Sequence, residues 1–97
     1  MSARLLWLVA ATATILLDAG LTASRAASRD FCEEYARAAI VQVRGGLSNR
    51  GCVGGMQGAR WSAEYHVHFD WCLGASYAAA GAERDARTNY LKACRGQ

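Results

Sequence analysis

The chain has 97 residues, four cysteines, no proline and a formal net charge of +3. This length allows one small domain after any processed segment. Basic and acidic residues are interspersed along the chain, and we therefore expect no basic stripe and no nucleic-acid partner.

The first 26 residues have the layout of a secretory signal peptide. Arg4 precedes an apolar run from Leu5 to Leu17, and the segment 24–26 fits the small-x-small rule for cleavage. We expect cleavage after Ala26, with Ala27 as the neighbouring option. The apolar run is shorter than the about 20 residues that a membrane-spanning helix needs. The predicted domains are a signal peptide over 1–26 and a mature domain over 27–97, with no stable membrane span after cleavage.

The expected mature domain contains all four cysteines, Cys32, Cys52, Cys72 and Cys94. An even number of cysteines in a small exported domain indicates two disulfides formed in an oxidising compartment. A core this small gives little net stability, so such domains usually need covalent links. We predict a periplasmic or secreted protein.

The first predicted helix covers 30–44. Asp30 is the expected N-cap, and Glu33 completes a pattern like a capping box. Apolar residues recur at helical spacing behind them. Gly45 and Gly46 are expected to end this helix. Six glycines fall between Gly45 and Gly58, so we predict a glycine-rich loop there.

The segment 62–76 has two interpretations. Apolar and polar residues alternate from Glu64 to Trp71, which is typical of a strand. Read as a helix, the same segment places Trp61, Tyr65 and Cys72 on one face, with Ser62 as the N-cap. A lone strand would leave its backbone groups without a partner. We therefore predict a helix over 62–76.

The last helix is predicted to begin at 78 or 82 and to end near 95. Tyr90, Leu91 and Cys94 share its apolar face, and Glu83 is expected to pair with Arg87 one turn later. The fold class is therefore all-α, a small disulfide-stapled three-helix domain with a glycine-rich loop. Four cysteines allow three pairings. Antiparallel packing of the first and third helices would bring Cys32 to Cys94, so we predict Cys32–Cys94 and Cys52–Cys72.

His66 and His68 are the candidate metal ligands. On a strand, residues two apart point the same way and both imidazoles could reach one zinc ion. On a helix the two rings diverge by about 200°, and a shared metal is excluded. His68 and Cys72 would be adjacent on a helix, but a disulfide explains Cys72 better than a nucleophile does. We expect no catalytic residue, no enzyme activity and no cofactor.

Arg60 and Trp61 are the candidate ligand-binding residues, together with His68. An indole beside a guanidinium could stack on a sugar ring or another flat ligand. The alternative is that Trp61 closes the helix entry as a hydrophobic staple, with the indole buried as tryptophan usually is.

Five short motifs together resemble a known group of proteins. They are Cys32-x2-Tyr35-Ala36, Gly51-Cys52, Gly58-x-Arg60-Trp61-Ser62, His68-x2-Trp71-Cys72 and Glu83-x3-Arg87-x3-Leu91-x2-Cys94. The joint pattern covers nearly all of the mature chain and resembles a family of short exported four-cysteine proteins of α-proteobacteria, particularly rhizobia and their relatives. The resemblance implies a periplasmic location. That family has no assigned activity, so no function follows from it.

A second resemblance is partial. Small lectin-like immunoreactive antigens of the same bacteria also carry a tryptophan near a cysteine, but the Arg/Tyr/Ser run that follows their cysteine is replaced here by LGASY at 73–77. Our leading hypothesis is a non-catalytic structural or interaction domain of the periplasm, with an envelope protein or glycan as the candidate partner. A weak lectin-like binder of envelope glycans and a zinc-binding protein are the alternatives.

Overall fold

The computed structural model describes residues 25–96, so nearly all of the predicted signal peptide lies outside the described residues. The described chain is all-α, as predicted. Its elements are α2 (Arg29–Leu47), the one-turn helix α3 (Arg50–Val53), the 3-10 turn η3 (Ala59–Trp61), α4 (Tyr65–Leu73) and α5 (Tyr77–Cys94). In this part of the chain, no helix is long and apolar enough to cross a membrane.

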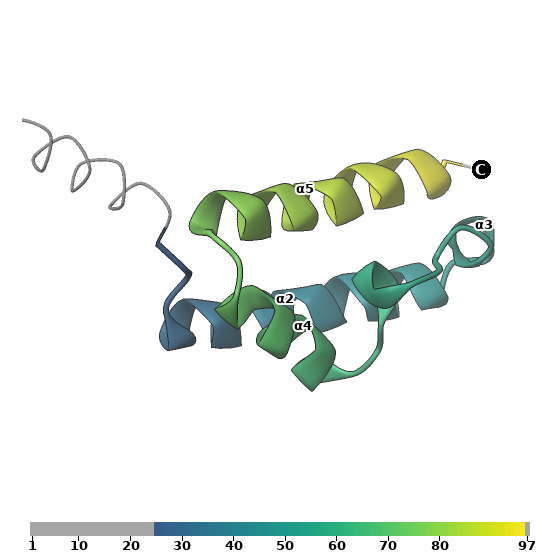
Figure 1. The fold of residues 1–97 in the computed structure, drawn as a ribbon. Coiled ribbons are helices and arrows are strands. Elements are labelled where there is room, and N and C mark those ends of the chain that lie inside the picture. Colours follow the sequence, from purple (N-terminus) through teal and green to yellow (C-terminus); the bar gives the residue numbers. More distant parts are fainter. Residues whose placement is uncertain (1–24, 97) are drawn as a thin grey trace, which may run out of the picture.

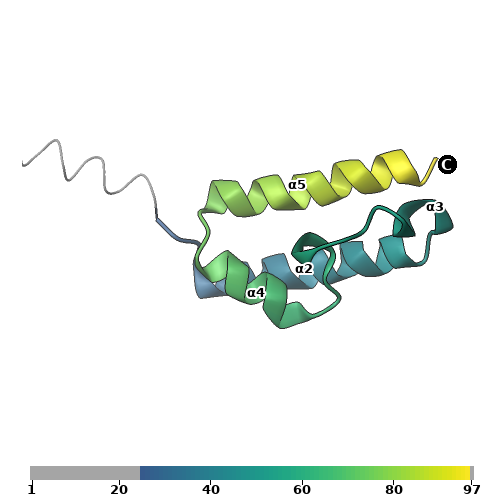
Figure 2. The same ribbon diagram turned by 45° about the vertical axis from the view of Figure 1, so that its right-hand side comes forward.

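The three longer helices alternate in direction. In both ribbon views α2 and α5 lie side by side and run the same way, while α4 runs back along the first half of α2 (Figure 1, Figure 2). The glycine-rich segment between Leu47 and Tyr65 turns the chain back once, and the short connection between Leu73 and Tyr77 turns it back again. Two reversals of the chain therefore make the first and third long helices parallel. The antiparallel arrangement that we predicted for this pair was wrong.

The disulfide pairing differs from the prediction for the same reason. Cys32 lies in the first turn of α2 and Cys94 in the last turn of α5, so a parallel pair puts them at opposite ends. The structure pairs Cys32 with Cys72 and Cys52 with Cys94. The paired residues are 40 and 42 positions apart. By the chain-entropy relation, each link contributes about 4 kcal/mol to the free energy of unfolding.

Helix α2 is longer at both ends than predicted. Its N-cap is Ser28, whose hydroxyl accepts a hydrogen bond from the Phe31 N–H, and Asp30 lies in the first turn instead. The helix continues through Gly45 and Gly46 to Leu47. The glycine-rich segment predicted as a loop also contains the helix α3, capped by Asn49.

The segment that could have been a strand is helical, as we predicted, but shorter than 62–76. Helix α4 begins at Tyr65, after Glu64 in the N-cap position. The Ser62 hydroxyl accepts from the Glu64 N–H and shapes the turn before the helix. Helix α5 begins at Tyr77 because the Ser76 hydroxyl caps it by accepting from the Ala79 N–H.

The core consists of two clusters, each built around one disulfide. One contains Ala27, Cys32, Tyr35, Cys72 and Ala80, and the other contains Val43, Cys52, Trp61, Leu91 and Cys94. Along α2, two fully buried alanines, Ala36 and Ala39, lie between the residues that belong to the two clusters. Helix α5 supplies Arg87, a charged residue that is only 1% exposed.

The disulfide pairing can be tested by tryptic peptide mapping without reduction. Cleavage after arginine and lysine separates all four cysteines. We expect peptide 30–37 linked to 61–84, and peptide 51–60 linked to 93–95. Mass spectrometry of the linked peptides distinguishes this from the antiparallel arrangement. A link between 30–37 and 93–95 would show that the described pairing is wrong.

Gly46 has a role in packing, which adjacent Gly45 does not share. A Cβ atom at Gly46 would lie 2.5 Å from Met56 Sδ and 3.0 Å from Leu91 Cδ2, whereas at Gly45 it would meet only the flexible end of Arg95. We expect Gly46→Ala to lower the free energy of unfolding by about 1–3 kcal/mol, because it overfills the core. Gly45→Ala should be neutral or stabilising, since alanine favours a helix interior. Urea denaturation of both variants checks this, and equal effects would contradict it.

Candidate functional site

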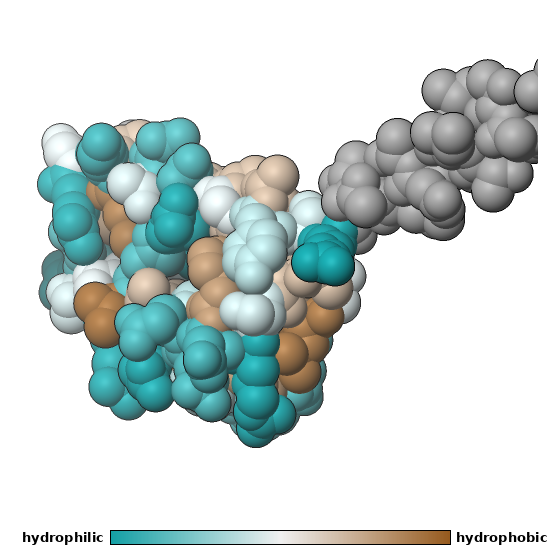
Figure 3. Space-filling model, turned by 90° about the vertical axis from the view of Figure 1, so that its left-hand side faces the viewer, coloured by the Kyte–Doolittle hydropathy of each residue, from teal (hydrophilic) through white to brown (hydrophobic). Residues whose placement is uncertain are grey.

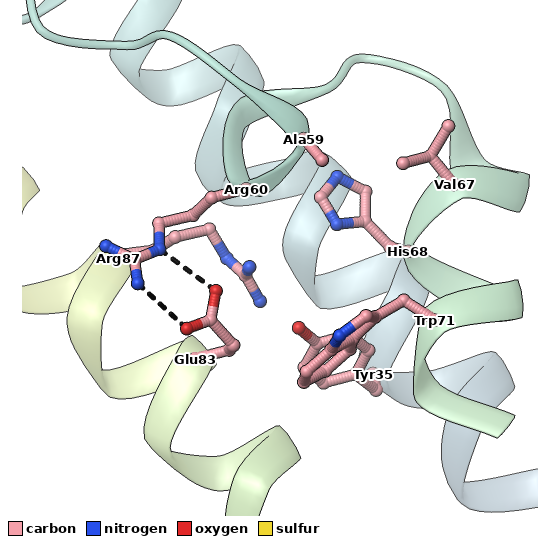
Figure 4. A pocket seen from close by; sticks show the side chains of 8 residues that line it. All are labelled: Tyr35, Ala59, Arg60, Val67, His68, Trp71, Glu83 and Arg87. Atoms are coloured by element: carbon pink, nitrogen blue, oxygen red, sulfur yellow. Dashed lines mark hydrogen bonds and ion pairs between the residues drawn. The ribbon is translucent and has the colours of Figure 1, made fainter. Parts of the chain in front are cut away.

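A partly enclosed cavity of about 110 Å³ lies where η3, α4 and α5 meet α2 (Figure 4). Tyr35 and Trp71 contribute aromatic rings to its wall, and Ala59 and Val67 contribute aliphatic groups. Four polar or charged side chains complete the lining: Arg60, His68, Glu83 and Arg87. The lining is therefore mostly apolar, with a few convergent polar groups, which is the composition typical of small-ligand sites, although the cavity is smaller than most of them.

Arg87 is the unusual residue of this cavity. Its side chain is only 1% exposed. The Arg87 Nε–H donates to Gln42 Oε1 over 2.7 Å, and the guanidinium carbon lies 5.1 Å from the centroid of the Tyr35 ring. Its Nη2 atom is buried and has no hydrogen-bond partner among the described residues. Figure 4 shows the guanidinium pointing into the space between Glu83, Tyr35 and His68.

Gln42 of α2 fixes the orientation of Arg87. The Gln42 Nε2 group donates to Thr88 Oγ1 over 2.9 Å and to the Arg84 carbonyl over 3.2 Å, both on α5. The amide is thus held with its carbonyl oxygen toward Arg87, where it accepts the Nε–H. Because these bonds are made within the protein, the guanidinium is positioned before any ligand arrives.

Arg60 and Glu83 form the one bidentate ion pair in the described chain. Arg60 Nε and Nη2 each donate over 2.9 Å to one oxygen of the Glu83 carboxylate. These hydrogen bonds lower the pKa of Glu83, with a smaller contribution from the charge of Arg87, and raise the pKa of Arg60. The pair fastens η3 to α5. It replaces the helical Glu83–Arg87 pair that the sequence predicted.

His68 forms another part of the wall. It is 3% exposed, and its Nε2 lies 2.7 Å from the Ser62 carbonyl oxygen. A carbonyl oxygen can only accept, so this Nε2 carries the hydrogen. The bond ties the turn before α4 to the helix itself. Of the predicted ligand-binding residues, Arg60 and His68 therefore meet in the same cavity.

Trp61, the third predicted ligand-binding residue, lies elsewhere. Its side chain is 9% exposed and its ring lies 5.1 Å from that of Tyr90, inside a core cluster. It lines a separate, more open hollow of about 460 Å³, which Arg60 and Glu83 also line. Little of the Trp61 face is free for a sugar. Trp71, which sequence reasoning did not select, is 44% exposed and lines the cavity.

The zinc hypothesis depended on a strand, and residues 65–73 are a helix. His66 is exposed and lies 3.5 Å from Glu64, whereas His68 is buried and bonded to Ser62. No group of three or more His, Cys, Asp or Glu residues in the described part of the chain could hold a metal ion. The geometry therefore gives a zinc site at His66 and His68 no support.

Sequence reasoning missed Tyr35, Glu83 and Arg87 as cavity residues. One signal for Arg87 was present, since it shares a helix face with Ala80, Leu91 and Cys94, all of which are buried. A charged residue on an otherwise apolar face indicates a buried polar site.

Comparisons with known proteins identify no relative: no protein-family model, no curated protein and no solved structure matches the chain. The resemblance to exported α-proteobacterial proteins therefore stays a prediction.

The lowered pKa of Glu83 predicts a pH-dependent contribution to stability. The unfolded chain binds the proton more readily, so this contribution is present above the ordinary glutamate pKa and is lost as pH falls through the lowered pKa, below about pH 4. We expect Glu83→Gln to lower the free energy of unfolding by up to about 1 kcal/mol at neutral pH, since the pair is partly exposed. The difference from wild type should shrink at about pH 3.

Urea denaturation at several pH values checks this expectation. Glu34→Gln is the matched control, because Glu34 forms an exposed ion pair with Arg37 on the surface of α2. The control should show no comparable pH-dependent difference. A Glu83→Gln difference that stays constant from neutral to acidic pH would contradict the assignment.

Proposed function

We propose that the protein is an exported, non-catalytic interaction domain of the periplasm that binds its partner group in the cavity at Arg87. The observation that carries this proposal is the preformed cavity itself, in which a buried cation keeps a donor without a partner in the described chain. On the face in Figure 3, hydrophobic residues form separate patches among hydrophilic ones. That distribution favours recognition by a cavity over docking of a broad apolar surface on this face.

The disulfides indicate the kind of compartment in which the protein folds. All four cysteines are paired, which indicates an oxidising environment outside the cytoplasm. The predicted leader and the resemblance to exported α-proteobacterial proteins make the periplasm the specific proposal. An envelope protein or glycan that presents a small group to the cavity is the proposed kind of partner.

The start of the described chain supports processing after Ala26. Ala27 is buried in a core cluster, and its backbone N–H donates to the Ala75 carbonyl over 2.8 Å. The N–H of Ser28, the N-cap of α2, donates to the Tyr77 hydroxyl over 3.0 Å. Cleavage after Ala26 keeps both bonds, since a terminal ammonium still donates. Cleavage after Ala27 would remove a core residue.

Two observations support a non-catalytic role. No cysteine of the described chain is a free thiol, so the His68–Cys72 arrangement has no nucleophile. The His68 Nε2–H is committed to a backbone carbonyl. The lectin-like alternative has weaker support, because Trp61 packs in the core and Arg60 is bonded to Glu83.

Native mass spectrometry of the protein purified from the periplasm tests the export and disulfide parts of the proposal, and the binding part is tested by the titration described below. We expect a chain that begins at Ala27, weighs four hydrogens less than the reduced chain and carries no metal. The control is the same chain without residues 1–26, expressed in the cytoplasm, which should be recovered reduced or degraded. A retained leader, or a reduced periplasmic chain that carries zinc, would contradict the proposal.

A further inference from the structure

We infer that the cavity at Arg87 binds a carboxylate group carried on a small apolar body. This inference rests on the proposed binding function, because it assigns a ligand class to the same cavity. It depends on the geometry around one guanidinium and not on the compartment.

The ligand must first supply a hydrogen-bond acceptor. A guanidinium carries five N–H donors, and the Arg87 Nε–H is already bonded to Gln42. Nη2 is buried, has no partner in the described chain and belongs to a guanidinium that points into the cavity (Figure 4). Buried donors in folded proteins are almost always satisfied. An acceptor placed in the cavity satisfies this one.

The ligand must also be an anion with a single charge. Both oxygens of Glu83 accept from Arg60, so those two charges neutralise each other at the edge of the cavity. The close partners of Arg87 are the amide of Gln42 and the ring of Tyr35, and both are neutral. The lining therefore has one positive charge in excess. A planar carboxylate matches a guanidinium in charge and shape.

Size and wall chemistry restrict the rest of the ligand. The cavity is small: its volume of about 110 Å³ lies well below the roughly 300–1,000 Å³ of pockets for drug-sized ligands. Ala59 and Val67 offer aliphatic contact, and half-exposed Trp71 offers a flat face toward solvent. A carboxylate with one to three further carbons fits this space, and the acyl group of a larger ligand such as a peptide terminus would extend past Trp71 toward solvent. A phosphate dianion would bring a second negative charge that the lining does not balance.

Such a carboxylate has two sources, a free short-chain acid or the carboxyl terminus of a peptide. The probes are propionate for the free acid, N-acetylalanine for the peptide terminus, and inorganic phosphate. Propionamide is the control for charge, because it has nearly the shape of propionate without its anionic oxygens.

The experiment is a titration of the ¹⁵N-labelled oxidised mature protein, followed by NMR. The Trp71 indole N–H and the Arg87 Nε–H report on the cavity, and the Trp61 indole N–H serves as an internal reference. We expect saturable shifts of the two cavity signals with propionate or N-acetylalanine, and none with propionamide. Tighter binding of N-acetylalanine than of propionate would identify the peptide terminus as the source, and the reverse order the free acid.

Two substitutions test the assignment to Arg87. Arg87→Met keeps similar bulk without the donors and should weaken carboxylate binding by at least about tenfold. Arg84→Met is the matched control, because it removes the same charge from the exposed side of the same helix, and it should bind like wild type. Ala59→Leu fills the cavity from the exposed turn η3 and leaves Arg87 intact. It should also abolish the shifts, so the test survives if Arg87→Met does not fold.

Any of the following results would overturn the inference. They are equal responses to propionate and propionamide, a response to phosphate alone, and carboxylate binding that survives both Arg87→Met and Ala59→Leu. No response to any probe from a protein with both disulfides would also overturn it. A response to phosphate alone would thus contradict the carboxylate assignment but not binding in the cavity, whereas no response to any probe would contradict both. The export proposal is tested separately by its mass measurement.

Discussion

Two buried disulfides hold the helices together, and the other packing contacts depend on the positions that they set. Cys32–Cys72 joins the start of α2 to the end of α4, and Cys52–Cys94 joins α3 to the last turn of α5. Each is the centre of one core cluster. Several other core positions are alanines, which bury little apolar area and contribute little transfer free energy. Covalent links therefore replace part of the stabilisation that larger side chains would provide.

A domain that is cross-linked by two disulfides can bury a charged side chain such as Arg87. A core of the same size without these links would be less able to offset the cost of that burial. Burying a guanidinium costs free energy, and Gln42 and Tyr35 compensate only part of it. An apolar side chain of similar volume is often neutral or stabilising in place of a buried ion. Stability alone therefore does not account for Arg87. The binding role that we propose would account for it, because the donor without a partner in the described chain belongs to the group that points into the cavity.

The helices were predictable because the signals for them are local. Apolar spacing indicated α2 and α5 to within a few residues, although the N-cap of α2 is Ser28 and not the predicted Asp30. The lack of a partner strand argued against the strand interpretation of 62–76. The arrangement of the helices was not predicted, because we assumed that the first and third were antiparallel. Gly46 also shows that a local sequence signal does not reveal a tertiary contact. A glycine near a helix end looks like a stop signal, whereas here it admits Met56 and Leu91, which only the folded chain brings close.

The charge of the cavity depends on a contact between distant parts of the sequence. From the sequence alone, Glu83 and Arg87 form an ordinary pair one turn apart on a helix surface. In the structure, η3 brings Arg60 onto α5, and Arg60 occupies both carboxylate oxygens of Glu83. Arg87 is then turned toward α2, with Gln42 and Tyr35 as its neighbours. Docking of the glycine-rich segment thus gives an otherwise neutral face of α5 one excess positive charge, at the point where the core leaves a cavity.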